Sequence, residues 1–145
     1  MTARPRILLL DDNRAWLETL KDYLRTKGFT VLTTANAAKA LNLLEHYEFA
    51  LVVCDYHMPD MDGLQFVRLA HHLRPEISVL MISSEEEPVL LHKVMASGAK
   101  GVIAKTVAPG VLLDKVRQLV DLWRSLQAGD LDAWQRLLPE PQKVG

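Results

Sequence analysis

The stretch Ile7-Leu8-Leu9-Leu10-Asp11-Asp12 joins a short apolar run to two adjacent carboxylates. A second apolar run, at 49–54, is likewise followed by a carboxylate, Asp55. If the two runs are neighbouring parallel strands, all three acidic side chains converge at the carboxyl ends of those strands. Such a concentration of negative charge is unfavourable unless a cation neutralises it. Because Mg²⁺ takes oxygen ligands, typically one or two carboxylates with waters, the stretch predicts a magnesium site with phosphoryl chemistry beside it.

Apolar runs alternate with segments of helical periodicity along the chain. The apolar runs predict strands at 6–11, 29–34, 49–54, 77–82 and 101–104. Helices are expected after each strand, with Asn36 as an N-terminal cap, Gly28 just past a C-terminus, and Pro88 and Pro109 in first turns. Strands that are apolar throughout and alternate with helices indicate an α/β fold. The expected architecture is a doubly wound, five-stranded parallel sheet with helices on both faces.

A doubly wound sheet binds ligands outside the carboxyl ends of its strands, at the point where the strand order reverses. In the strand order 2-1-3-4-5, that point lies between the first and third strands, where Asp11, Asp12 and Asp55 fall. The fold and the charge pattern therefore select the same edge of the sheet independently.

The composition has no strong bias: of 145 residues, 49% are hydrophobic and 24% charged, with a formal net charge of −1. No basic run supports direct binding to nucleic acid, and no stretch is long enough to cross a membrane. Cys54 is the only cysteine, which excludes an intramolecular disulfide and fits a reducing compartment. We therefore expect a cytoplasmic protein with one domain over 5–127. Residues 128–145 are expected to form a linker or a short amphipathic helix.

Three side chains at the predicted edge are candidates for phosphoryl chemistry. Asp55 is the candidate phosphoacceptor, because a carboxylate can attack phosphorus once a metal and a cation shield the incoming charge. Lys105 closes the fifth predicted strand and could pair with Asp55 or with a phosphoryl oxygen. Ser83 closes the fourth and could donate its hydroxyl to the phosphoryl group. Taken singly, Asp55 could be a turn residue, Lys105 a solvated lysine and Ser83 a helix cap. The pair Asp11-Asp12 could likewise be a helix N-cap followed by an acid in the first turn. Their concentration at one edge favours the functional interpretation.

Two neighbours of Asp55 are interpreted differently from it. His57 follows by two residues, and its backbone carbonyl is the part expected to matter at the site. Cys54 precedes it and should point to the opposite face of the strand, into the core.

These motifs jointly resemble a response-regulator receiver domain of two-component signalling, and they occur in family order over residues 6 to about 126. The matching motifs are Asp11-Asp12, Asp55, Met58-Pro59, Asp62-Gly63, Ser83, 96–101 and Lys105. The resemblance implies a flavodoxin-like receiver fold and a signalling domain that is no enzyme beyond its own phosphorylation and dephosphorylation. It also implies that Asp55 accepts a phosphoryl group from a sensor histidine kinase or phosphotransfer protein.

The resemblance further implies roles for the residues around Asp55. Asp12 and Asp55 resemble direct Mg²⁺ ligands, and the backbone carbonyl of His57 resembles a third. Asp11 resembles a ligand that acts through water. Ser83 and Lys105 resemble the pair that binds the phosphoryl group.

In the family, phosphorylation biases two arrangements of the face formed by the helix expected at 88–97, the strand at 101–104 and the last helix. That face would contact an output protein, an output domain or a second copy of the chain. Ser83 and Val102 occupy the switch positions, and Val102 stands where the family usually has an aromatic side chain. Thr106 replaces a proline that is often cis, and we expect a trans bond because a cis bond to threonine costs about 3 kcal/mol. The segment 105–109 is similar to receivers attached to a helix-turn-helix of the nitrate-regulator type.

Two other functions stay open at this point. A phosphohydrolase of the haloacid dehalogenase type uses similar groups, but its second aspartate would here be Asn13, and no acidic pair follows Lys105 at a strand end. A receiver-like interaction module that is never phosphorylated stays possible because of Val102 and Thr106. Turnover of a phosphate ester identifies the first, and partner binding that survives Asp55→Ala identifies the second.

Overall fold

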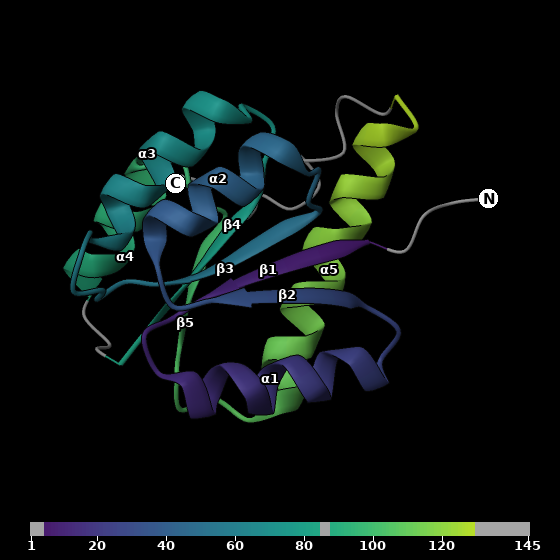
Figure 1. The fold of residues 1–145 in the computed structure, drawn as a ribbon, viewed down its shortest axis with the longest axis horizontal. Coiled ribbons are helices and arrows are strands. Elements are labelled where there is room, and N and C mark those ends of the chain that lie inside the picture. Colours follow the sequence, from purple (N-terminus) through teal and green to yellow (C-terminus); the bar gives the residue numbers. More distant parts are fainter. Residues whose placement is uncertain (1–4, 85–87, 130–145) are drawn as a thin grey trace, which may run out of the picture.

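The computed structural model describes residues 5–84 and 88–129. Five strands form one parallel sheet in the order β2-β1-β3-β4-β5 (Figure 1). The strands are β1 (Arg6–Leu10), β2 (Thr30–Thr34), β3 (Leu51–Asp55), β4 (Val79–Ser83) and β5 (Gly101–Ala104). The helices are α1 (Arg14–Thr26), α2 (Ala37–His46), α3 (Gly63–Leu73), α4 (Pro88–Ala96) and α5 (Pro109–Gln127). The predicted fold class and strand order are confirmed.

Two strands lie further along the chain than the apolar runs predict. β3 begins at Leu51 instead of 49, and β4 spans Val79–Ser83 instead of 77–82. Phe49 and Ile77 are buried, but they pack into the core from the segments that precede the strands. At these two positions a hydrophobic side chain therefore indicates burial in the core but not backbone pairing in the sheet. The predicted starts of the two strands are wrong by about two residues.

The N-terminal caps of the helices show whether the pair Asp11-Asp12 serves as a helix cap. α1 begins after Asn13, whose side-chain oxygen accepts a hydrogen bond from the Trp16 amide over 3.1 Å. Neither Asp11 nor Asp12 is therefore the N-cap, and the plainer interpretation of that pair is wrong. Asn36 caps α2 in the same manner, as predicted.

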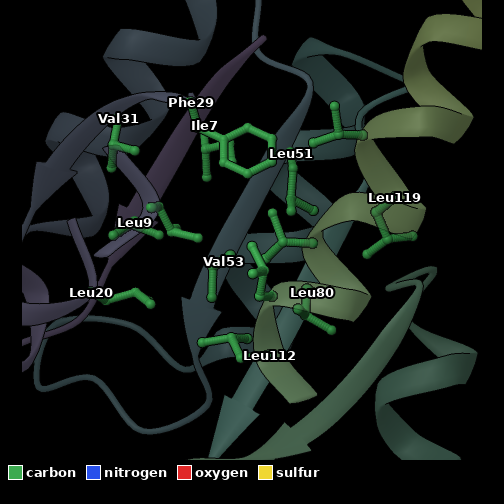
Figure 2. Close-up of a cluster of buried hydrophobic side chains, with 14 of the residues drawn as sticks. Ile7, Leu9, Leu20, Phe29, Val31, Leu51, Val53, Leu80, Leu112 and Leu119 are labelled. Carbon is green, nitrogen blue, oxygen red and sulfur yellow. The ribbon is translucent and has the colours of Figure 1, made fainter. Parts of the chain in front are cut away.

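Two apolar layers hold the sheet between its helices. α1 and α5 cover one face, while α2, α3 and α4 cover the other (Figure 1). Figure 2 shows the first layer, to which Leu20 of α1, Val53 of the central strand and Leu119 of α5 all belong. Cys54, the next residue along β3, is fully buried in the second layer, as predicted. Because successive residues of a strand face opposite layers, the uniformly apolar strands follow from burial on both faces.

The last helix ends where the sequence predicts a break, at Gln127, and Gly129 follows with a φ of 91°. The amphipathic helix predicted within 128–145 falls almost entirely outside the described residues. Within the described part of the chain, no helix is both long and apolar enough to cross a bilayer.

Candidate functional site

Three carboxylates meet at the edge of the sheet where β1 and β3 end. Parallel pairing sets Leu10 beside Cys54, so Asp11 and Asp55, one residue further on, emerge side by side. One carboxylate oxygen from each of Asp11, Asp12 and Asp55 lies within 4.8 Å of the others. Asp11 is fully buried and Asp55 is 6% exposed, whereas Asp12 faces solvent. The predicted convergence of the three side chains is present.

The carboxylate of Asp11 fits a site for a cation. Its Oδ1 accepts a hydrogen bond from the Asn13 amide over 2.8 Å. Its Oδ2 is buried, and the Lys105 ammonium lies 2.7 Å away as an ion-pair partner. One lysine charge does not balance three clustered carboxylates, so the cluster favours a further cation. Because the cluster offers carboxylate oxygens alone, with solvent access at Asp12, it suits Mg²⁺ with bound waters.

Lys105 enters the site from the end of β5. Its amide donates to the Ser83 carbonyl over 2.8 Å, and its peptide bond to Thr106 is trans, as predicted. Its side chain is 20% exposed, and the ammonium lies 2.7 Å from Asp11 Oδ2 and 3.7 Å from Asp55 Oδ2. The sequence predicts pairing with Asp55, whereas the closer partner is Asp11. The lysine therefore bridges both carboxylates.

Burial and charge act in opposite directions on the Lys105–Asp11 pair. Burial raises the pKa of Asp11 above its usual value, although the Lys105 ammonium and the Asn13 amide oppose the shift. Burial alone would lower the pKa of Lys105, but the contact with Asp11 and the charge of Asp55 raise it overall. The lysine therefore stays positively charged at neutral pH beside the carboxylates.

The remaining predicted residues surround this cluster. Ser83 is fully buried and ends β4, one residue beyond Ile82, the strand partner of Asp55. The His57 amide donates to Asp55 Oδ1 over 3.3 Å, so this residue touches the site through its backbone. Its carbonyl remains a predicted ligand. Val102 is half-buried in β5 against the second apolar layer, and its switch role likewise remains a prediction.

Gly63 shapes the site without having been assigned a role from the sequence. Its amide donates to the Tyr56 carbonyl over 2.9 Å and closes the loop that follows β3. A Cβ atom at this position would lie 2.6 Å from Met81 Sδ and 3.0 Å from the Asp55 carbonyl oxygen. The pair Asp62-Gly63 signals a turn, but the close approach to β3 depends on how α3 packs.

Two further residues reach the surroundings of the cluster from other elements. Asp60 Oδ2 accepts a hydrogen bond from the Ala37 amide over 3.2 Å, which ties the loop after β3 to the start of α2. Trp16 of α1 packs against the first apolar layer, and its ring centroid lies 5.2 Å from Lys105 Nζ. No signal in the sequence distinguishes these contacts, since each joins segments that only tertiary packing brings together.

Comparison with known proteins gives a family match and a set of relatives. Residues 7–117 match the response regulator receiver domain family. The two-component response regulator ARR12 of Arabidopsis thaliana is 32% identical over 129 residues, covering 88% of this chain and 20% of that protein. The C4-dicarboxylate transport transcriptional regulatory protein DctD of Rhizobium meliloti (strain 1021) is 30% identical over 118 residues, with coverages of 81% and 26%. The chain therefore spans about a quarter or less of these relatives' length.

Solved structures share the fold. A receiver domain protein (CheY-like) from Methanospirillum hungatei JF-1 aligns with a TM-score of 0.80 and 31% identity, covering 85% of this chain and 98% of that one. The signal receiver domain of an HD domain-containing protein from Pseudomonas fluorescens Pf-5 aligns with a TM-score of 0.81 and 27% identity, covering 88% and 95%. Both alignments span nearly the whole of the solved domain.

Proposed function

The chain belongs to the response regulator receiver domain family, and we propose that it takes a phosphoryl group from a sensor histidine kinase or phosphotransfer protein onto Asp55. One observation carries this proposal. Asp55 lies within 4.8 Å of two further carboxylates, and a lysine ammonium lies 3.7 Å from its Oδ2. A carboxylate nucleophile, an acidic metal-binding set and a cation at one edge are the parts that phosphoryl transfer to aspartate needs.

Each residue has an assigned atom in this transfer. A carboxylate oxygen of Asp55 forms the new O–P bond as the P–N bond of a phosphohistidine breaks. Oδ2, the oxygen that faces Lys105, is the nucleophile we propose, because Oδ1 accepts the His57 amide. The Lys105 ammonium and the Ser83 hydroxyl would donate to phosphoryl oxygens and balance their negative charge.

The three carboxylates and the backbone carbonyl of His57 would hold Mg²⁺, with Asp11 acting through water. When bound, the ion neutralises the carboxylates and stabilises charge on the transferring phosphoryl group. The carboxylate of Asp11 is buried and that of Asp12 is exposed, so the proposed ion would lie between the protein interior and solvent.

The output side of the proposal lies on α4, β5 and α5. A phosphoryl group adds about −1.5 to −2 charges. It would contact Ser83, the last residue of β4, and Lys105, which directly follows β5. The side chains of Leu91 and Met95 on α4 and of Val111 on α5 are exposed apolar groups available to an output protein or a second copy. We assign Ser83 and Val102 to the switch, residues 5–127 to the receiver, and the cytoplasm as its location.

Intact mass spectrometry after incubation with acetyl phosphate and Mg²⁺ tests the phosphoacceptor. Asp55→Asn removes the nucleophile, while Asp60→Asn is a matched control, because an amide oxygen can still accept from Ala37. A single Mg²⁺-dependent adduct in wild type and Asp60→Asn, absent in Asp55→Asn, is expected. No adduct, together with no binding of a beryllofluoride–Mg²⁺ mixture, would contradict the proposal and favour the unphosphorylated interaction module. Sustained release of phosphate from an ester would instead indicate a phosphohydrolase.

A further inference from the structure

We propose that Trp16 is a positioning residue for phosphoryl transfer: its indole face holds the Lys105 ammonium at the carboxylate cluster, a role that rests on the proposed phosphorylation of Asp55. The ring centroid lies 5.2 Å from Lys105 Nζ, within the range of a cation–π contact. Such contacts strengthen when the cation is partly removed from water, and the Lys105 side chain is only 20% exposed.

A closed circuit of four residues fixes the indole relative to the cluster. The Asn13 amide donates to Asp11 Oδ1 over 2.8 Å, and Asn13 Oδ1 accepts from the Trp16 amide over 3.1 Å. The indole then faces Lys105, whose ammonium returns to Asp11 Oδ2 over 2.7 Å. Because the cap of α1 is one link of this circuit, the backbone of Trp16 is tied to the same carboxylate as the lysine that it faces.

A cavity explains why the position of Lys105 depends on this contact. A cavity of about 170 Å³ lies between α1, β5 and α5, and both Trp16 and Lys105 line it. The rest of its lining is mainly apolar, including Leu20, Tyr23 and Ile103. Close packing does not hold the lysine on this side, so the ring and the carboxylates are what retain its ammonium. A smaller side chain at position 16 would enlarge the space into which the lysine can turn away.

The chemistry of the step favours a ring over a hydrogen-bonding neighbour. Lys105 lies 2.7 Å from Asp11 and 3.7 Å from Asp55, so its ammonium must shift toward the phosphoryl group as the O–P bond forms. A ring face attracts the cation without a fixed donor–acceptor direction. The ammonium can therefore move along the indole from one carboxylate to the other without losing this contact.

Trp16→Leu and Trp16→Phe separate the ring face from general packing. Phosphorylation by acetyl phosphate at saturating Mg²⁺ is followed by intact mass over a range of donor concentrations. Trp16→Leu is expected to lower the rate at saturating donor about three- to tenfold, whereas Trp16→Phe should stay within about twofold of wild type. In a Lys105→Met background, Trp16→Leu should produce no further loss, because its effect passes through the lysine. Trp16→Met supplies a second non-aromatic variant should Trp16→Leu unfold.

The Lys105 ε-methylene proton shift provides a readout that needs no reaction. Ring current should move this resonance upfield in wild type and Trp16→Phe, and the shift should disappear in Trp16→Leu. Equal phosphorylation rates in wild type and Trp16→Leu, or an equal loss in the Lys105→Met background, would overturn the positioning role alone. Absence of any adduct in wild type would overturn the proposed function, and the positioning role with it, so the two failures are distinguishable.

Discussion

The Lys105 ammonium lies 2.7 Å from Asp11 Oδ2 but 3.7 Å from Asp55 Oδ2. The lysine is therefore paired more closely with a buried carboxylate of the candidate metal site than with the proposed phosphoacceptor. Because Mg²⁺ would neutralise that same carboxylate, the ion and the lysine compete for the charge of Asp11. Binding of the ion would then free the ammonium for the phosphoryl group at Asp55.

Removal of the lysine should strengthen Mg²⁺ binding. Lys105→Met deletes a positive charge next to the carboxylates, and we expect the Kd for Mg²⁺ to fall about tenfold at low ionic strength. Isothermal titration calorimetry measures this directly. Lys93→Met is the matched control, since it deletes the same charge from an exposed position on α4. Equal Mg²⁺ affinities for the two variants would contradict the competition.

The raised pKa of Asp11 gives the stability a defined pH dependence. Between the unfolded and folded pKa values of Asp11, the folded protein binds more protons than the unfolded chain, so its stability falls as pH rises through that window. Without Mg²⁺, Asp11→Asn should therefore be more stable than wild type at neutral pH, with the difference shrinking as pH falls through the window. Urea denaturation over acidic to neutral pH measures this.

Saturating Mg²⁺ should reverse the order of these two proteins. A ligand that binds only the folded state stabilises it in proportion to its affinity, and Asp11→Asn weakens the proposed site. An Asp11→Asn protein that is less stable than wild type without Mg²⁺, at every pH, would show that the Lys105 ion pair outweighs burial.

The position of the site could be predicted from the sequence because parallel strands carry its residues to one edge. Asp11 and Asp55 each follow an apolar run, and the register of β1 and β3 brings them together. What could not be predicted is the pairing within the site. Burial differs sharply between Asp11 and Asp12, and only the packed structure shows which carboxylate lies within reach of Lys105.

Contacts between separate elements were missed for a related physical reason. Trp16 fits the apolar stripe of α1, and a hydrophobic pattern carries no information about a neighbouring ammonium. Gly63 reads as an ordinary turn glycine, although the absence of a Cβ matters because α3 starts against β3. In β3 and β4, buried residues that precede the strands obscured the boundaries.

Gly63→Ala should destabilise the fold, because the added methyl group would meet Met81 and the backbone of Asp55. We expect a loss of about 1–3 kcal/mol in the free energy of unfolding, measured by urea denaturation. Gly110→Ala is the control, since a Cβ there meets nothing within 4 Å and the residue lies in α5. That substitution should be neutral or stabilising by up to about 1 kcal/mol. A Gly63→Ala protein as stable as Gly110→Ala would refute the close approach.

Two asparagine caps should have equal effects on stability and different effects on phosphorylation. Asn13 caps α1 and Asn36 caps α2, so replacement of either by alanine should cost about 1 kcal/mol in the free energy of unfolding. Only Asn13 links Asp11 to Trp16. Asn13→Ala should therefore slow phosphorylation by acetyl phosphate several-fold, while Asn36→Ala leaves the rate near that of wild type. The reverse pattern would exclude the circuit through Asn13.

The identity of the modified residue tests the central claim most directly. After incubation with acetyl phosphate and Mg²⁺, borohydride reduction converts an aspartyl phosphate to homoserine, which peptide mass spectrometry can locate. The proposed function predicts homoserine at position 55, formed only when Mg²⁺ is present. Homoserine at Asp11 or Asp12 instead, or a phosphorylated protein without homoserine at position 55, would contradict the assignment of Asp55 as phosphoacceptor.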